Sequence, residues 1–199
     1  MDGKGSNARS YLSKINRPAK ISKIIQYFYH MLKEKFDHTL DMWISELQKF
    51  SFDELCRKPS ITSWSMSQVC MHLLKETDFY FGQAKICALT DNDDDKKMSA
   101  NAEKLFNDSE LSDVIIEGPD TNTEFTLPES KKWLIKRFEK LKNDAEIIAG
   151  LISKTSFHGK TSHPGFGYFG AHDWFKFAEI HMRHHLRQQK RIALFLKSS

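Results

Sequence analysis

The chain has 199 residues, and its 40% of hydrophobic and 28% of charged residues are typical of a globular protein. A formal net charge of +4 is too small to indicate a nucleic-acid-binding protein, and no apolar run reaches the roughly 18 residues of a membrane span. The three cysteines show no Cys-x-x-Cys spacing. We therefore expect neither a disulfide framework nor a thiolate zinc site, and reduced thiols fit a cytoplasmic protein.

The beginning of the chain is basic and carries no acidic residue between positions 3 and 33. We predict that residues 1–20 form a flexible basic tail and that residues 21–199 form one domain, since a chain of this length supports a single substantial core. A basic, acid-poor start is also loosely similar to an organellar transit peptide, which is the alternative to a tail on a cytoplasmic protein.

Four stretches place apolar residues at alternating steps of three and four, the pattern of an amphipathic helix. We predict helices over about 21–47, 65–86, 129–152 and 174–195, with no strand alternation competing. Ser65 and Gln68 form a capping-box pattern at the start of the second helix. The expected core face of that helix carries Val69, Phe79 and Ile86.

The link between the second and third predicted helices, about 90–127, is long and polar. Because a link of this length can cross a bundle, we predict an all-α four-helix bundle with up-down-down-up topology. The acidic run 91–95 superficially resembles a calcium-binding loop. Lys96 stands where such a loop requires Gly, and Ala102 stands where it requires Glu, so we predict an acidic surface turn.

The most informative feature is a histidine cluster near the end of the chain. His181 and His185 are four residues apart on the fourth predicted helix, so their rings project from one face. One such pair is weak evidence, since about 0.4 pairs are expected by chance from nine histidines. His72 shares the predicted core register of the second helix. Burying three imidazoles is costly unless their nitrogens are satisfied. Spacing alone leaves two alternatives open. The three histidines either share one divalent ion or are hydrogen-bonded separately in the core.

Two sequence patches resemble the DinB/YfiT-like metal-binding four-helix bundles. They are Trp64-Ser65 with Gln68 and His72-Leu73, and His163-Pro-Gly-Phe-Gly167 with Trp174 and His181-x-x-His184-His185-Leu-Arg-Gln188. The resemblance extends from about residue 20 to the end of the chain. It implies a bundle with a long crossover after the second helix. It also implies a metal triad made of His72, His181 and His185 that holds one divalent ion.

Three further residues are candidates near this site. Glu76 lies one turn beyond His72, where it could accept a proton from bound water, orient a ligand imidazole or face solvent. His184 lies about 60° of helical arc from His181, so we expect it beside the ligands and not among them. His163 belongs to a Pro-Gly turn and is either brought to the site or left as an ordinary loop residue. The motifs of di-iron bundles and of His-Glu-x-x-His proteases are missing from the sequence.

Three neutral imidazoles leave a divalent ion its full charge and an open position, the pattern of catalytic zinc. Zinc, nickel and iron all suit this ligand set. Such an ion lowers the pKa of bound water and deprotonates a bound thiol. The resemblance implies a thiol-dependent transferase or isomerase that uses a low-molecular-weight thiol, or a metal-dependent hydrolase.

We therefore expect a metalloenzyme that acts on small molecules. The alternatives are a non-catalytic domain in which the ion cross-links two helices, and a metal-free bundle that serves for dimerisation. A homodimer is possible in each case, with the aromatic first helix as a plausible surface.

Overall fold

The computed structural model describes residues 19–109, 111 and 127–198, and within these ranges the chain is mostly helical, as predicted. The predicted tail at 1–20 lies outside the described residues except for its last two positions. The elements are α2 (Ala19–Gln48), α3 (Phe52–Cys56), α4 (Met66–Cys87), α5 (Ala100–Asp108), α6 (Lys131–Lys154), β1 (Lys160–His163), β2 (Gly167–Gly170), α7 (Ala171–His184) and α8 (Leu186–Lys197). Among the described residues, no helix is long and apolar enough to cross a membrane.

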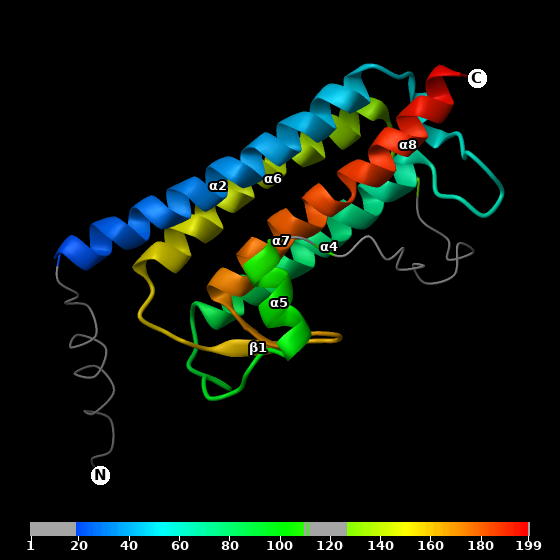
Figure 1. Cartoon of the computed structure of the whole chain (residues 1–199). Helices are drawn as coiled ribbons and strands as arrows, with labels where there is room; N and C mark the ends of the chain where they lie inside the picture. The colour runs from blue at the N-terminus through cyan, green and yellow to red at the C-terminus, as the bar shows by residue number, and fades with distance from the viewer. Residues whose placement is uncertain (1–18, 110, 112–126, 199) are drawn as a thin grey trace, which may run out of the picture.

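The long helices lie side by side, and α7 runs into α8 to form the last of these segments (Figure 1). α2 packs against α6 and α7, while α4 packs against α6, α7 and α8. The link that joins α4 to α6 contains the unpredicted helix α5, and residues 110 and 112–126 of this link lie outside the described residues. The exact up-down-down-up topology stays a prediction.

Side-chain caps fix where α4 and α6 begin. Ser65 accepts a hydrogen bond from the backbone N–H of Gln68, whose side chain in turn accepts one from the Ser65 N–H, so the predicted capping box is present. Ser130 caps α6 by accepting from the N–H of Trp133. Each cap satisfies backbone donors that the first helical turn leaves without partners.

The predicted core positions of α2 and α6 are buried wherever the structure describes them. These positions are Leu32, Phe36, Leu40, Trp43 and Leu47 on α2, and Leu134, Phe138, Leu141, Ala145, Ile148 and Ile152 on α6. The predicted face of α4 is wrong in part, because Phe79 and Ile86 are 45% and 47% exposed. The buried face of α4 is rotated toward Leu73, Thr77 and Tyr80. His72 therefore lies at the edge of the core and not at its centre.

A short β-hairpin that the sequence analysis did not predict joins α6 to α7. β1 and β2 pair antiparallel with Lys160 opposite Gly170. Gly167 has a positive φ of 77°, and a Cβ there would lie 2.9 Å from the Lys97 carbonyl oxygen. Only glycine adopts this backbone at so close an approach without strain. The hairpin thereby docks on the segment before α5, and it carries His163 at the end of β1.

The fourth predicted helix is two helices. α7 ends at His184 and α8 begins at Leu186, with His185 between them. His185 keeps a right-handed helical backbone (φ −71°, ψ −10°), and its N–H still donates to the His181 carbonyl over 3.3 Å. The helix is thus loosened at a predicted metal ligand, and the two rings of the pair stay one turn apart.

Polar contacts buried beside the core hold α7 in place. The indole N–H of Trp43 on α2 donates to the Met182 carbonyl over 3.1 Å. Glu179 is 5% exposed, accepts from Thr39 and pairs with Arg183. Arg183 also donates to the Ser109 carbonyl over 2.6 Å, which ties α7 to the end of α5. The helix that carries His181 is therefore fixed from two sides.

We expect Phe138→Ala on α6 to lower the free energy of unfolding by about 3–5 kcal/mol, because it leaves a cavity among fully buried rings. Phe138 is fully buried and stacks on Trp43 with ring centroids 6.0 Å apart. The matched control is Ile147→Ala on the same helix, where the side chain is 67% exposed. Urea denaturation measures both, and equal losses in the two variants would contradict the described core.

Candidate metal centre

The structure brings together the three histidines that the resemblance implied. His72 comes from the second turn of α4, His181 from the last turn of α7, and His185 from the junction of α7 and α8. One ligand atom from each lies within 4.8 Å of the others, and all three residues are partly buried. This is a group that could hold one metal ion.

The spacing of the nitrogens fits a metal ion. Nε2 of His181 lies 3.3 Å from Nε2 of His72 and 3.2 Å from Nε2 of His185. Two ligands at 2.0–2.1 Å from a tetrahedral zinc ion are about 3.3 Å apart. The observed separations match that value.

Hydrogen bonds alone do not satisfy this arrangement. The Nε2 of a neutral imidazole is either a donor or an acceptor, and it has one in-plane position for a partner. His181 makes two close Nε2 contacts, so hydrogen bonding serves at most one of them. The alternative of three separately hydrogen-bonded core histidines therefore does not account for both Nε2 contacts of His181. A cation facing all three lone pairs satisfies both contacts.

The neighbour of His185 fixes its tautomer. Its Nδ1 lies 2.8 Å from the Gln188 side-chain oxygen, one turn along α8. Nδ1–H donates to that oxygen, which leaves the Nε2 lone pair free for a metal. Metal-binding histidines commonly donate their second N–H in this way. The sequence analysis names Gln188 as part of the C-terminal patch that resembles the family but assigns it no role, although its i+3 spacing from His185 is visible.

Burial keeps the triad neutral. Loss of hydration lowers the pKa of His72 to about 4, and the nearby Lys75 ammonium acts in the same direction. Burial likewise lowers the pKa of His185 to about 4, although the hydrogen bond that His185 donates to Gln188 acts in the opposite direction. The pKa of His181 falls well below its usual value through burial and through the other two rings. Neutral imidazole is the form that binds a metal.

Aromatic rings surround the triad. The Trp64 ring centroid lies 5.3 Å from that of His72, and the Tyr80 centroid lies 5.7 Å from that of His181. Phe177 stacks on His181 at 6.1 Å with the planes 2° apart. Rings of this kind displace water from around an ion and strengthen electrostatic interactions beside it. Tyr80 and Phe177 were missed from the sequence, although Tyr80 lies two helical turns beyond His72.

The other candidate residues lie beside the triad. Burial raises the pKa of Tyr80, and the nearby Glu76 carboxylate on the same helix acts in the same direction. The His184 ring is 5.4 Å from His185, but His184 is not in the group that could share an ion. His163 packs against the ring of Phe177, with centroids 5.0 Å apart.

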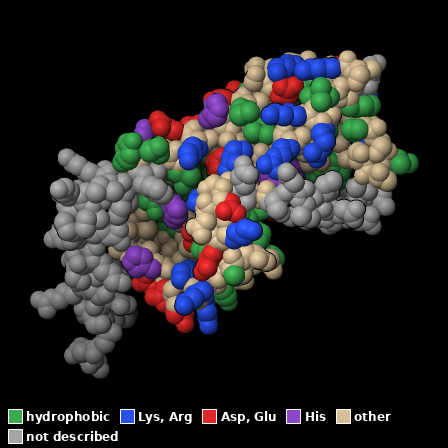
Figure 2. All heavy atoms as spheres, viewed as in Figure 1, with side chains coloured by type: hydrophobic (Ala, Val, Ile, Leu, Met, Phe, Trp, Pro, Cys, Tyr) green, Lys and Arg blue, Asp and Glu red, His purple; other side chains and the backbone are tan. Residues whose placement is uncertain are grey.

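The surface near α8 is basic. The exposed face of α8 carries Arg187, Lys190, Arg191 and Lys197, and this helix contains no acidic residue. Lys and Arg side chains gather at this end of the molecule (Figure 2). The Arg191 charge lowers the pKa of His184 and of His185, although less than burial does.

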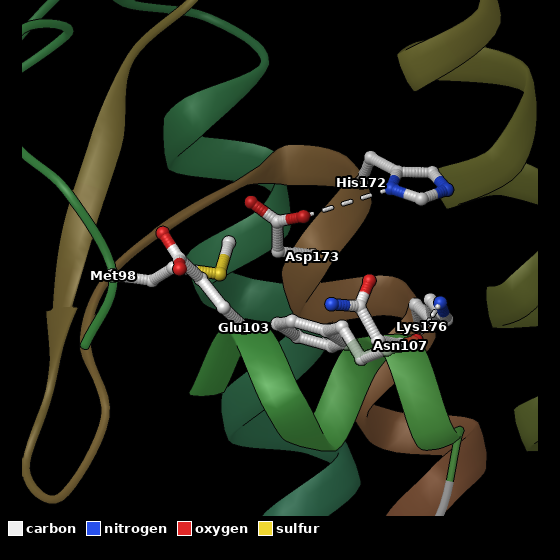
Figure 3. A pocket seen from close by; sticks show the side chains of 7 residues that line it. Met98, Glu103, Asn107, His172, Asp173 and Lys176 are labelled. Atoms are coloured by element: carbon white, nitrogen blue, oxygen red, sulfur yellow. Dashed lines mark hydrogen bonds and ion pairs between the residues drawn. The ribbon is translucent and has the colours of Figure 1, made fainter. Parts of the chain in front are cut away.

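A separate cavity of about 350 Å³ lies between α5 and the first turns of α7 (Figure 3). Glu103 and Asn107 line it from α5, and His172, Asp173 and Lys176 line it from α7. None of the triad histidines belongs to its lining. Asp173 accepts a hydrogen bond from the Gly170 N–H over 3.0 Å, and Lys176 donates one to the Phe106 carbonyl. Two of the charged groups that line the cavity are therefore already hydrogen-bonded to the backbone.

We expect the metal-free protein to lose stability as the pH falls from 7 to 5. His72 and His185 stay neutral in the fold down to about pH 4. The unfolded chain binds protons below about pH 6.5, so acid favours unfolding by about 1–2 kcal/mol for each of the two histidines. Urea denaturation of chelator-treated protein measures this. His185→Phe should reduce the pH dependence, whereas His38→Phe on the exposed side of α2 should not.

The comparisons with known proteins agree with this geometry. The model of the DinB superfamily matches residues 32–189, which is well over half of the chain and includes His72, His181 and His185. No curated protein and no solved structure matches the chain. The resemblance seen in the two sequence patches is thus confirmed at the level of the family, and the chain belongs to the DinB superfamily.

Proposed function

We propose that this protein is a metal-dependent enzyme of the thiol S-transferase or hydrolase type. In this proposal His72, His181 and His185 hold one zinc, nickel or iron ion. The observation that supports it is the approach of Nε2 of His72 and Nε2 of His185 to within 3.2–3.3 Å of Nε2 of His181. The ligand set contains no carboxylate or thiolate, so a bound ion keeps its full positive charge.

Three protein ligands are the number found in catalytic zinc sites, where the fourth position is left to water or substrate. When bound, the ion would lower the pKa of a coordinated thiol or water and so supply a nucleophile. The chain's own residues hold the site in place: Gln188 orients His185, and aromatic rings restrict water around the triad. In this proposal Glu76, one helical turn beyond His72 on α4, accepts a proton from the nucleophile.

The first test is metal content. Protein purified without chelator or affinity tag is expected to contain about one equivalent of zinc, nickel or iron by plasma mass spectrometry. His181→Ala should lose the metal, because two imidazoles alone bind a divalent ion weakly, while circular dichroism stays helical. His184→Ala removes a neighbouring imidazole and should keep the metal. Full occupancy in His181→Ala, or no uptake by the parent, would contradict the triad.

A second candidate function is a structural cross-link. It is favoured by the position of the triad, which joins α4 to the loosened junction of α7 and α8. In this alternative the ion only holds the helices together, and its fourth position is closed.

Access of a small thiol to the ion separates the two functions. We expect 2-mercaptoethanol to bind the cobalt-loaded protein and to produce a sulfur-to-cobalt charge-transfer band, because three imidazoles leave a position free. A cobalt spectrum unchanged at high thiol concentration would favour the structural role. The variant His72→Ala, expected to bind no cobalt, controls for thiol binding to cobalt in solution.

A further inference from the structure

The cavity between α5 and the start of α7 is enclosed by segments that are tied to one another. The Ser99 N–H donates to the Phe166 carbonyl over 2.8 Å, so the segment before α5 is held on the hairpin. Lys176 of α7 donates to the Phe106 carbonyl of α5 over 2.8 Å, and Arg183 ties α7 to the end of α5. The cavity of about 350 Å³ is therefore preformed, and its size is at the small end of the range of ligand sites.

Two carboxylates line this cavity. Glu103 reaches it from the exposed side of α5, and Asp173 reaches it from the first turn of α7 (Figure 3). Among the described residues, Glu103 forms no ion pair. Asp173 uses Oδ2 to accept from the Gly170 N–H, and its Oδ1 lies 3.7 Å from Nδ1 of His172, which is longer than a hydrogen bond. Both carboxylates can therefore accept hydrogen bonds from a ligand.

An ammonium and an amide line the cavity as well. Lys176 comes from α7 and Asn107 from the last turn of α5, and in Figure 3 both lie on the side away from Glu103. An ammonium has three N–H donors, and the bond to the Phe106 carbonyl uses one of them. Burial lowers the pKa of Lys176, although the Asp173 carboxylate acts in the opposite direction. A ligand carboxylate next to Lys176 would offset this loss of hydration.

Apolar side chains complete the lining. The Phe106 ring packs against Phe169 of the hairpin with centroids 5.1 Å apart, and Met98 pairs with Gly167 in an isolated β-bridge. Phe106 and Met98 are thereby fixed where they line the cavity. The cavity thus offers two acceptors of negative charge, one positive donor and an apolar wall.

We propose that this cavity is a second binding site of the protein, and that its ligand is an α-amino acid with an apolar side chain. Glu103 and Asp173 accept hydrogen bonds from the α-ammonium group. Lys176 and Asn107 donate to the α-carboxylate, and the apolar side chain packs against Phe106. A ligand with only one of the two charges leaves either the carboxylates or the ammonium of the site without a partner. None of the triad histidines lines the cavity, so this inference does not depend on the proposed function.

The experiment titrates the full chain with L-leucine and with its two analogues of single charge, 3-methylbutylamine and 4-methylpentanoate. Two-dimensional amide NMR spectra locate the ligand and measure its affinity. We expect leucine to shift the signals of α5 and of the first turns of α7 until they saturate. Each analogue should bind about fivefold more weakly or worse, because it loses one set of charge-assisted hydrogen bonds. Equal affinities for the three compounds, no saturable binding of leucine, or shifts at the triad in place of α5 would overturn the proposal.

Two substitutions on α5 test the lining. Glu103→Gln removes a charge that faces the ammonium, so it should weaken leucine by about fivefold and leave 4-methylpentanoate unchanged. Asp108→Asn makes the same change in net charge at an exposed position of α5 outside the lining, and it should have no effect. Asn107→Trp places a large ring at an exposed position that lines the cavity, so it should abolish leucine binding in a folded protein.

The outcomes separate this inference from the proposed function. His181→Ala should keep the leucine affinity of the parent, because the triad is not part of this site. Glu103→Gln and Asn107→Trp should keep the metal content of the parent for the same reason. Leucine affinity that is unchanged in both Glu103→Gln and Asn107→Trp would overturn the second site and leave the metal-dependent enzyme proposal standing.

Discussion

The meeting of three imidazole Nε2 atoms between α4 and the junction of α7 and α8 is the constraint that the packing around them has to satisfy. Neutral imidazoles at 3.2–3.3 Å repel through their lone pairs unless a hydrogen or a cation lies between them. Because His181 has two such contacts, one hydrogen does not relieve both. Other contacts, or a bound ion, must therefore hold α4 and α7 close enough together for the three rings to meet.

Those other contacts are visible on the side of α7 away from α4. The indole of Trp43 and the hydroxyl of Thr39 connect α2 to α7, and Arg183 connects α7 to the end of α5. On the opposite end, Thr161 of the hairpin accepts from the Trp174 indole over 2.7 Å. The position of His181 is thus determined by packing that does not involve a metal. A preformed site of this kind needs little rearrangement to bind an ion, which favours affinity for the ion.

Helix positions followed from the sequence because the periodicity of α2 and α6 is unambiguous and the caps at Ser65 and Ser130 are local signals. The face of α4 was misjudged because this helix carries apolar residues on two sides, and only tertiary packing decides which side is buried. The hairpin has no strand pattern in the sequence. It depends on the close approach of Gly167 to Lys97, a tertiary contact that local sequence does not reveal. The triad followed from the family resemblance, because spacing alone left two readings open. Glu76 and His163 were visible as candidates, but the Gly165 N–H that donates to Nδ1 of His163 is set by the fold.

The composition of the site determines how its selectivity arises. Three imidazoles contribute no charge, so they suit several divalent ions and would leave the choice of ligand to the groups around the open position. In a centre with a carboxylate or thiolate among its ligands, part of the metal charge is neutralised and the incoming ligand is held less strongly. Here three neutral ligands would leave the full charge of the ion to attract an incoming anion or thiolate. Discrimination among ligands must come from residues outside the coordination sphere, and the aromatic rings that contact His72 and His181 are placed there by the fold. The residues that hold the ion are thus different from the residues that would select its ligand. A fold can therefore keep a metal triad while a few neighbouring side chains change the specificity of the site.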